Sequence, residues 1–411
     1  MITLLYELGS GLLNTLSLQA LLHNQYYFQT AKKIIFGLNS ITNIAIEAKR
    51  LHGYRVFVIS DKNIKKLGIV DKITNYLGTK EFSIKIFDKI ESDPSLSTAE
   101  TATNIARQKT YDLIVGIGGG SVMDIAKIVA IMVNNSGDVN DYVTKKEFKE
   151  KALPKILIPT TAGTGSEASQ AAVITLDNKQ KYSFSNPLLF SDVSIIDPML
   201  TISMPPEITA STGIDALSHA VEAIMSNSSN PITSALSLEA IRLINDNLRT
   251  AYVKGENLKA RIGMSWAALL GGMVLCAKVV YGHSIGYTIS QRYELSHGAS
   301  CGLALPYVME YNLRTCVEKF ISIANIFGDK VESVSKIEDA RKAIFAIIKL
   351  IKDVGLPSSL REAGIPKEDL PILAEELLEA YPRPNNPRPI DMKNALKIYN
   401  RAWKGKIDKQ L

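Results

Sequence analysis

The chain has 411 residues, of which 46% are hydrophobic and 21% charged, and its formal net charge is +6. A single hydrophobic core stops growing at about 250–300 residues, so two domains are expected, and the composition is that of an ordinary globular protein. The positive charge is not gathered into basic runs with interleaved aromatic residues, which argues against a nucleic-acid partner.

The N-terminus and the cysteines bear on the compartment. The first 22 residues are fairly apolar, but polar residues interrupt them and no basic segment or clear cleavage site accompanies them. We predict a peripheral helical extension within residues 1–29 and not a membrane-spanning helix. Cys276, Cys301 and Cys316 are odd in number and lack CxxC spacing, so they are expected to be reduced thiols. These features favour a cytoplasmic protein without a membrane partner.

Between residues 30 and 204, short β-branched apolar runs alternate with helical patterns. Strands are predicted at residues 34–36, 55–59, 82–87, 113–117, 155–158, 172–175 and 193–196. Helices are predicted at residues 41–51, 64–77, 97–107 and 122–130. Strands that alternate with helices form βαβ units, so this half is predicted to be an α/β domain with a mostly parallel sheet.

A glycine-rich turn joins the strand at 113–117 to the helix that follows it. The turn consists of Gly118, Gly119, Gly120 and Ser121. Glycines let a backbone approach a ligand closely, and a helix N-terminus offers free N–H groups and a positive dipole end. The turn therefore suits a pyrophosphate, although it is not GxGxxG and a tight turn without a ligand is the alternative.

Two other strand ends carry polar residues that suit a nucleotide. Asp61 follows the strand at 55–59, where an acidic residue commonly binds ribose hydroxyls and disfavours a 2′-phosphate. This favours NAD, with NADP as the alternative cofactor, but Asp61 could equally cap the next helix. Residues 159–167, after the strand at 155–158, are dense in hydroxyls and glycines that could bind phosphate or ribose.

From residue 205 to 411 strand-like runs nearly vanish, which predicts an all-α domain. It contains three of the five histidines, and together with one aspartate the candidate metal ligands are Asp215, His219, His283 and His297. Asp215 and His219 are four residues apart and share one face of a helix. One carboxylate and three imidazoles suit a divalent first-row metal, Fe²⁺ or Zn²⁺. For any single histidine, a buried residue with satisfied hydrogen bonds is the alternative.

Assembled in this order, the segments resemble the iron-containing (metal-dependent) alcohol dehydrogenase family. The resemblance covers roughly residues 30 to 405 and rests on residues 118–127, 158–167, 213–223, 297–298, 303–312 and 386–389. It implies an α/β nucleotide-binding domain, then an all-α domain, in a dehydroquinate synthase-like architecture with the site in the cleft between them.

The resemblance also implies roles for particular residues. The metal would be held by Asp215, His219, His283 and His297, and the cofactor by Gly118, Gly119, Gly120, Ser121, Asp124, Thr160, Thr161, Thr164 and Lys181. Thr160, Thr161 and Thr164 would line the adenosine and nicotinamide side, and Lys181 would lie near the nicotinamide ribose. A divalent cation acts as a Lewis acid toward an alcohol, whose carbon then gives hydride to the nicotinamide. The expected partners are a small alcohol or aldehyde and further copies of the chain, as a homodimer or larger homo-oligomer.

One departure from the family concerns Tyr287. Many members have a further histidine four residues after the ligand that matches His283, and here that position is Tyr287. A phenol can donate a hydrogen bond, but its reference pKa is near 10. We therefore predict that Tyr287 positions the substrate and does not relay a proton.

Two alternative functions stay open. One is a polyol(-phosphate) dehydrogenase or a dehydroquinate-synthase-like enzyme on the same fold. A phosphate-bearing substrate would need cations in the cleft, for which Lys278 and Arg292 are candidates. The other is a nucleotide or metal binder that has lost turnover.

Overall fold

The computed structural model describes residues 25–407 except 79, 145–146 and 330–334, so most of the predicted extension at 1–29 lies outside the described residues. Six strands form a sheet in the order β1-β8-β5-β4-β2-β3, and every neighbouring pair is parallel. The strands are β1 (Ile34–Phe36), β2 (Arg55–Ile59), β3 (Ser83–Phe87), β4 (Leu113–Gly118), β5 (Lys155–Pro159) and β8 (Val193–Ile196). The predicted parallel α/β domain is confirmed.

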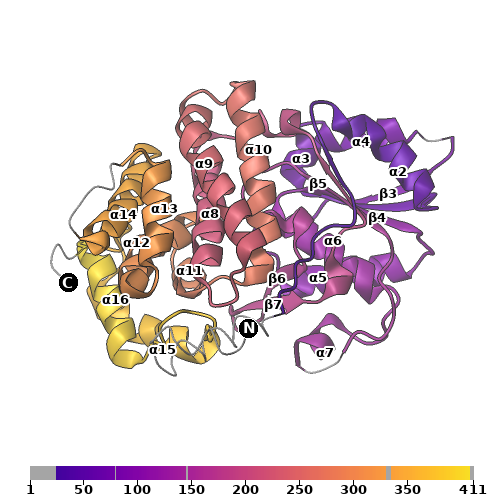
Figure 1. The fold of residues 1–411 in the computed structure, drawn as a ribbon. Helices are drawn as coiled ribbons and strands as arrows, with labels where there is room; N and C mark the ends of the chain where they lie inside the picture. The colour runs from indigo at the N-terminus through magenta and orange to yellow at the C-terminus, as the bar shows by residue number, and fades with distance from the viewer. Residues whose placement is uncertain (1–24, 79, 145–146, 330–334, 408–411) are drawn as a thin grey trace, which may run out of the picture.

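Helices cover both faces of this sheet (Figure 1). Side chains alternate along β2, so that Val56 and Val58 join the core on one face while Phe57 and Ile59 join the core on the other. One face is covered by α5 (Leu96–Arg107) and α6 (Gly120–Met132), the other by α2 (Ile44–Arg50) and α4 (Ile69–Leu77). Burial on both faces explains why these strands read as continuous apolar runs.

The predicted helix at 64–77 is wrong in one respect, because the chain breaks it into two. The short α3 (Lys62–Lys66) ends before Gly68, and α4 begins after it. Gly68 has a φ of 73°, in the left-handed region that a glycine adopts without steric cost. Gly68 is the residue in the sequence that indicates where the helix is interrupted.

Two further elements of the α/β half lie outside the main sheet. A separate antiparallel hairpin is made of β6 (Ala171–Thr175) and β7 (Lys181–Ser185). The short helix α7 spans Val139–Thr144. The hairpin is important for the site because Lys181 is the first residue of β7.

The second half of the chain is helical, as predicted (Figure 1). Its main helices are α8 (Pro206–Met225), α9 (Pro231–Val253), α10 (Leu258–Met273), α11 (Tyr281–Arg292), α12 (His297–Asn312), α13 (Val317–Ile326), α14 (Lys336–Asp353), α15 (Leu370–Ala380) and α16 (Met392–Lys404). They share one large hydrophobic core, in which α8 and α12 are buried at nearly every position.

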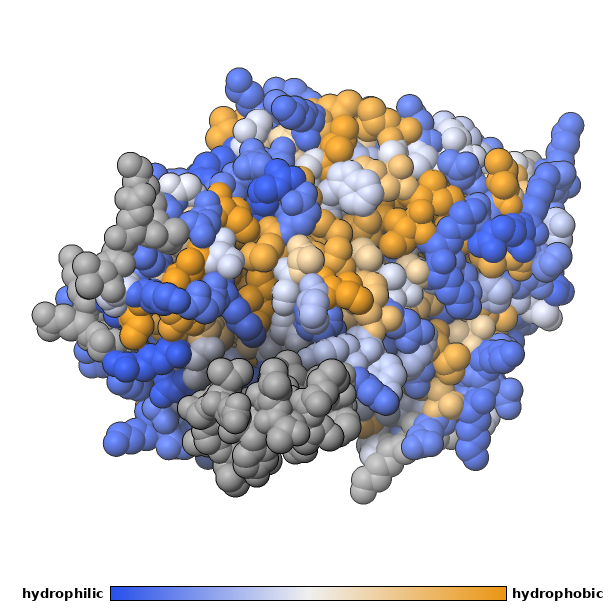
Figure 2. Space-filling model, viewed as in Figure 1, coloured by the Kyte–Doolittle hydropathy of each residue, from blue (hydrophilic) through white to orange (hydrophobic). Residues whose placement is uncertain are grey.

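One helical stretch, Leu258–Ala277, is long and apolar enough to cross a membrane, but 67% of its most apolar window is buried inside the protein. We therefore interpret it as a core helix. On the face in Figure 2, hydrophobic residues gather over the middle and hydrophilic residues over both ends. No second copy of the chain is described, so the homo-oligomer stays a prediction.

The two halves meet at a contact between two glycines. A Cβ atom built on Gly165, in the loop after β5, would lie 2.3 Å from the Cα atom of Gly272 in α10. A Cβ atom on Gly272 would lie 2.1 Å from the carbonyl oxygen of Gly165. The two backbones touch, and neither position has room for a side chain.

Candidate metal and cofactor site

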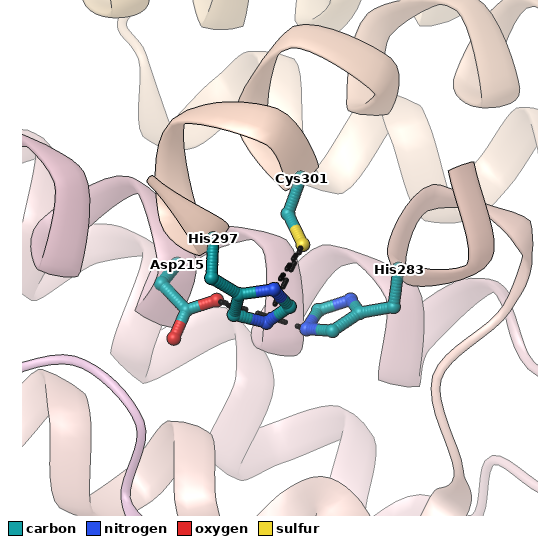
Figure 3. A group of neighbouring side chains, drawn as sticks. All are labelled: Asp215, His283, His297 and Cys301. Atoms are coloured by element: carbon teal, nitrogen blue, oxygen red, sulfur yellow. Dashed lines mark hydrogen bonds and ion pairs between the residues drawn. The ribbon is translucent and has the colours of Figure 1, made fainter. Parts of the chain in front are cut away.

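The four predicted metal ligands come together from three helices. Asp215 and His219 lie on α8, His283 on α11, and His297 is the first residue of α12. In Figure 3 the side chains of Asp215, His283 and His297 point toward one common region, together with Cys301. Asp215, His219 and His283 are buried, and the side chain of His297 is 28% exposed.

The distances within this group suit a bound cation. The Oδ1 atom of Asp215 lies 4.0, 3.7 and 3.6 Å from the Nε2 atoms of His219, His283 and His297. Two donors that each bind a tetrahedral ion at about 2.0–2.2 Å lie roughly 3.4 Å apart. The donors are therefore nearly at the spacing that a metal ion would give them.

Two of the donor atoms have no other function in the structure. The Oδ1 atom of Asp215 and the Nε2 atom of His283 are buried and have no hydrogen-bond partner among the described residues. Burying such atoms unpaired costs free energy, so each needs an explanation. A divalent cation between them would satisfy both, and the residues therefore fit the metal that the sequence implies.

Burial also keeps the imidazoles neutral, which is the form that binds a metal. Desolvation lowers the pKa of His219 to about 3 and that of His283 to about 4. It lowers the pKa of His297 to about 4 as well. At neutral pH protons do not compete for these donors.

Glu222, which was not among the residues predicted from the sequence, orients His283. The Oε1 atom of Glu222 lies 2.7 Å from Nδ1 of His283, and its Oε2 atom accepts hydrogen bonds from the backbone N–H groups of Val280 and His283. Glu222 is fully buried, and burial raises its pKa to about 8. A cation bound beside His283 would favour the ionised form of Glu222, and the carboxylate would then hold a proton on Nδ1 and leave Nε2 free for the metal.

Cys301, predicted from the sequence only as a reduced thiol, also lies in this group. Its Sγ atom lies 3.6 Å from Nε2 of His297, in a space that exists because Gly286 has no side chain. Burial raises the pKa of this thiol well above its usual value. Asp215, His283, His297 and Cys301 each offer a donor atom within 4.8 Å of the others, and His219 is not in this set. The Nε2 atom of His219 lies 4.0 Å from Oδ1 of Asp215, and its ring stacks on that of His283 at 4.6 Å.

The glycine turn has the form expected of a phosphate-binding turn. Helix α6 begins at Gly120, and its N-cap, Gly119, provides no side-chain hydrogen bond to the first turn. A Cβ atom on Gly120 would lie 2.6 Å from Thr164, and one on Gly118 would lie 2.6 Å from Val122. The backbone is therefore closely packed on the protein side and keeps free N–H groups at the helix start.

The loop that contains Thr160, Thr161 and Thr164, here called the threonine loop, contacts this turn, because Thr161 lies next to Gly119 and Thr164 next to Gly120. The hydroxyls of Thr160 and Thr161 are buried without a hydrogen-bond partner among the described residues, which leaves them available to a ligand. Asp124 is used differently, because its carboxylate accepts hydrogen bonds from the Ser166 hydroxyl at 2.5 Å and the Val173 N–H at 2.9 Å. It ties α6 to the loop, which suits a supporting role more than direct contact with the cofactor.

Asp61 has the capping role that the sequence left open. Its carboxylate accepts hydrogen bonds from the N–H groups of Asn63 and Ile64 at 2.8 and 3.0 Å, at the start of α3. It also lies beyond the carboxyl end of β2, next to β4 and its glycine turn. Capping and ribose binding are compatible, because a carboxylate can accept several hydrogen bonds.

Tyr287 lies beside the candidate ligands. Its ring stacks on that of His297 at 5.4 Å and meets the edge of the His283 ring at 6.5 Å. Its hydroxyl makes no hydrogen bond to the described residues, and burial raises the pKa of the phenol. Tyr287 also lines a cavity with Lys181, whose Nζ atom pairs with Asp93 at 2.5 Å.

The cationic residues named from the sequence as phosphate candidates do not line this cavity. Lys278 is exposed, and Arg292 pairs with Glu376 at 2.9 Å. The arginine at the cavity is Arg383, which the sequence analysis did not single out.

Comparisons with known protein families, sequences and structures all match this chain to alcohol dehydrogenases. Residues 31–198 match the model described as iron-containing alcohol dehydrogenase, and residues 209–403 match that of the C-terminal region of the same family. The chain is 35% identical to long-chain-alcohol dehydrogenase 1 of Geobacillus thermodenitrificans, over 90% of this chain and 95% of that protein. It is 30% identical to the NAD-dependent methanol dehydrogenase of Bacillus methanolicus, over 90% and 97%. The crystal structure of a 1,3-propanediol oxidoreductase superposes with a TM-score of 0.89 at 35% identity, covering 92% of this chain and 100% of that one.

Proposed function

Because the chain belongs to the iron-containing alcohol dehydrogenase family, we propose that Asp215, His219, His283 and His297 hold one divalent metal ion beside a nicotinamide cofactor. The protein is an oxidoreductase that transfers hydride between an alcohol carbon and that cofactor. When bound, the cation supplies a Lewis acid that favours loss of the alcohol proton.

The protein's own groups provide position and charge. Glu222 holds the His283 ring so that Nε2 faces the metal position. Gly118, Gly119, Gly120 and Ser121 bind the pyrophosphate at the start of α6, where free N–H groups and the helix dipole favour an anion. The unpaired hydroxyls of Thr160 and Thr161, together with Thr164, orient the adenosine and nicotinamide parts of the cofactor. Tyr287 contacts the substrate and fixes its position, since its phenol stays protonated at neutral pH.

The observation that carries this proposal is the convergence of unpaired buried donors, Asp215 Oδ1 and His283 Nε2, within 3.7 Å of each other. The test is a panel of alcohols and aldehydes with NAD(H) and NADP(H), using protein loaded with Fe²⁺, Zn²⁺ or Ni²⁺ and a chelated control. We expect aldehyde-dependent oxidation of NADH that disappears in the control. Tight metal binding without turnover on any substrate would favour the non-catalytic binder.

The names of the relatives span methanol to long-chain alcohols, so they do not limit the size of the substrate of this chain. The sequence alternative of a phosphate-bearing substrate relied on Lys278 and Arg292, and neither faces the cavity. That alternative therefore loses the residues on which it rested.

We also propose the finer assignments that the sequence suggests. Residues 30–204 and 205–411 form the two domains after an extension at 1–29, which agrees with family matches at 31–198 and 209–403. NAD is preferred over NADP because Asp61 would repel a 2′-phosphate. We propose a cytoplasmic homodimer or larger homo-oligomer, with Lys181 near the nicotinamide ribose.

A further inference from the structure

The cavity beside the candidate metal ligands has a cationic wall. It has a volume of about 190 Å³ and is lined by Val173, Lys181, Tyr182, Ser183, Tyr287 and residues 380–383. Two of these residues, Lys181 and Arg383, carry positive charge, and no lining residue is acidic. One of the two charges is already neutralised, because Lys181 pairs with Asp93 and also donates to the Thr175 hydroxyl at 3.0 Å.

Arg383 is in a different situation. Its Nε atom donates to the Ser284 hydroxyl at 2.8 Å, and its guanidinium carbon lies 6.0 Å from the centre of the Tyr287 ring. Among the described residues no carboxylate lies within ion-pair distance of it, although its positive charge acts on the buried Glu222, whose pKa it lowers against the larger effect of burial. The bond from Nε fixes the orientation of the group, while the terminal nitrogens make no hydrogen bond within the described part of the chain.

The backbone around Arg383 restricts its movement as well. Pro382 precedes it and Pro384 follows it, so both neighbours have a fixed φ. Tyr381, two residues before Arg383, is buried, and its carbonyl oxygen accepts a hydrogen bond from the Ser284 hydroxyl at 2.9 Å. A guanidinium that is oriented before its ligand arrives loses less entropy when it binds a planar anion through two parallel hydrogen bonds.

The position of Arg383 relative to the ligands limits the length of the substrate. The rings of Tyr287 and His297 are 5.4 Å apart, and Arg383 lies 6.0 Å from the Tyr287 ring. Together these distances keep the guanidinium within about 11 Å of the His297 ring. A molecule whose reacting oxygen lies beside the candidate metal ligands can reach Arg383 with only a few carbon atoms between its two ends.

We propose that the substrate is a short aldehyde, or the corresponding alcohol, with a carboxylate at the end remote from the reacting carbon, and that Arg383 binds this carboxylate. This inference rests on the proposed function. In the reduction the carbonyl carbon gains a hydride from NADH, which is oxidised to NAD⁺, and the carbonyl oxygen gains a proton from solvent. The carboxylate is unchanged and serves only to bind and align the molecule across Tyr287.

The test compares two aldehydes of equal length, 4-oxobutanoate and butanal, with the metal-loaded full-length protein and NADH. We expect wild type to have the higher kcat/KM for 4-oxobutanoate. Arg383→Gln should lower the ratio of the two kcat/KM values by roughly 10- to 100-fold, the scale of a hydrogen bond to a charged group, mainly through the KM for 4-oxobutanoate. Arg383→Lys should lower it less, because it keeps the charge but not the paired geometry.

Arg292→Gln is the matched control, because Arg292 pairs with Glu376 outside the cavity. It should leave the ratio unchanged. A wild-type protein that uses butanal as well as 4-oxobutanoate, or a ratio that Arg383→Gln does not lower, would overturn the proposal. A higher kcat/KM for glyceraldehyde 3-phosphate than for 4-oxobutanoate would overturn the carboxylate assignment in favour of a phosphate. Failure to reduce any of the three aldehydes would instead count against the proposed function itself.

A second measurement does not depend on turnover. Butanedioate has two carboxylates and no reducible carbonyl, and its binding to the metal-loaded protein with NAD⁺ can be followed by calorimetry. Arg383→Gln should weaken this binding by a similar factor, while Arg292→Gln should not. Equal affinity of wild type and Arg383→Gln for butanedioate would contradict the assignment.

Discussion

Glu222→Gln offers a sharp test of the metal site, because the two side chains have the same shape and differ only in which atoms accept hydrogen bonds. In the metal-bound wild type, where the cation favours an ionised Glu222, both carboxylate oxygens accept, one from the His283 ring and the other from two backbone N–H groups. A glutamine has one accepting oxygen and one donating NH₂ group. Whichever way the amide turns, its NH₂ group faces a donor.

The less costly arrangement keeps the oxygen on the two backbone N–H groups of Val280 and His283. The NH₂ group then faces Nδ1 of His283 and favours the tautomer that carries its proton on Nε2. That proton occupies the position of the metal. Loss of an outer partner of a metal-bound histidine typically weakens metal affinity 10- to 100-fold, or about 1.4–2.8 kcal/mol.

The assay is a Zn²⁺ titration of chelator-treated protein in competition with a chromophoric chelator, which gives the Kd directly. Glu310→Gln is the control, since Glu310 is a buried carboxylate of α12 that pairs with Arg401 away from the metal group. We expect the Kd to rise only in Glu222→Gln, while the melting temperatures of the metal-free wild type and Glu222→Gln stay close. A Kd for Glu222→Gln equal to that of the wild type would refute the tautomer argument.

Three further predictions concern the remaining site residues. His219→Ala should lose the metal by elemental analysis while Cys301→Ala retains it; the opposite result would put Cys301 in the ligand set in place of His219. Asp61→Gly should raise kcat/KM with NADP relative to NAD, at little cost to stability because glycine is a tolerated N-cap, and an unchanged ratio would remove Asp61 from the ribose site. Tyr287→Phe should cost roughly tenfold or less in kcat, the scale of one hydrogen bond, without changing the pH profile near neutrality, because burial raises the pKa of the phenol. A loss of several orders of magnitude with the metal retained would show that Tyr287 carries the proton, and Tyr287→Ala should cost more and alter substrate preference.

The parts of the structure that could be predicted are those with a local signature. The β-branched run of β2 was predicted at its observed limits, Arg55–Ile59, because both faces of that strand are buried. Asp215 and His219 could be grouped because four residues in a helix make one face. His283 and His297 were grouped with them because three of the five histidines of the chain lie in this half, and the family resemblance implied the same four ligands.

The parts that were missed depend on contacts between distant segments. Glu222 acts on His283, 61 residues further along. Its place three residues after His219 puts it on the same helix face, but a helix face alone does not show which distant side chain it meets. Arg383 binds Ser284, 99 residues earlier, and lies in a segment that looks like an ordinary proline-rich turn. Cys301 was judged by the absence of CxxC spacing, although four residues after His297 on a helix is a position that faces the same way.

The contact between Gly165 and Gly272 means that the separation of cofactor and metal is set where the protein has no side chains at all. One glycine follows the threonine loop, and the other lies on α10 against α8, which carries Asp215 and His219. A methyl group at either position would act as a wedge that moves the hydride donor away from its acceptor, while each half keeps its own binding residues. Such a variant would bind metal and nucleotide and still be a poor catalyst, since small displacements of reacting groups are costly. In a survey of inactive variants, a substitution at Gly165 or Gly272 would be mistaken for the loss of a catalytic residue, although its effect is to misalign two intact halves.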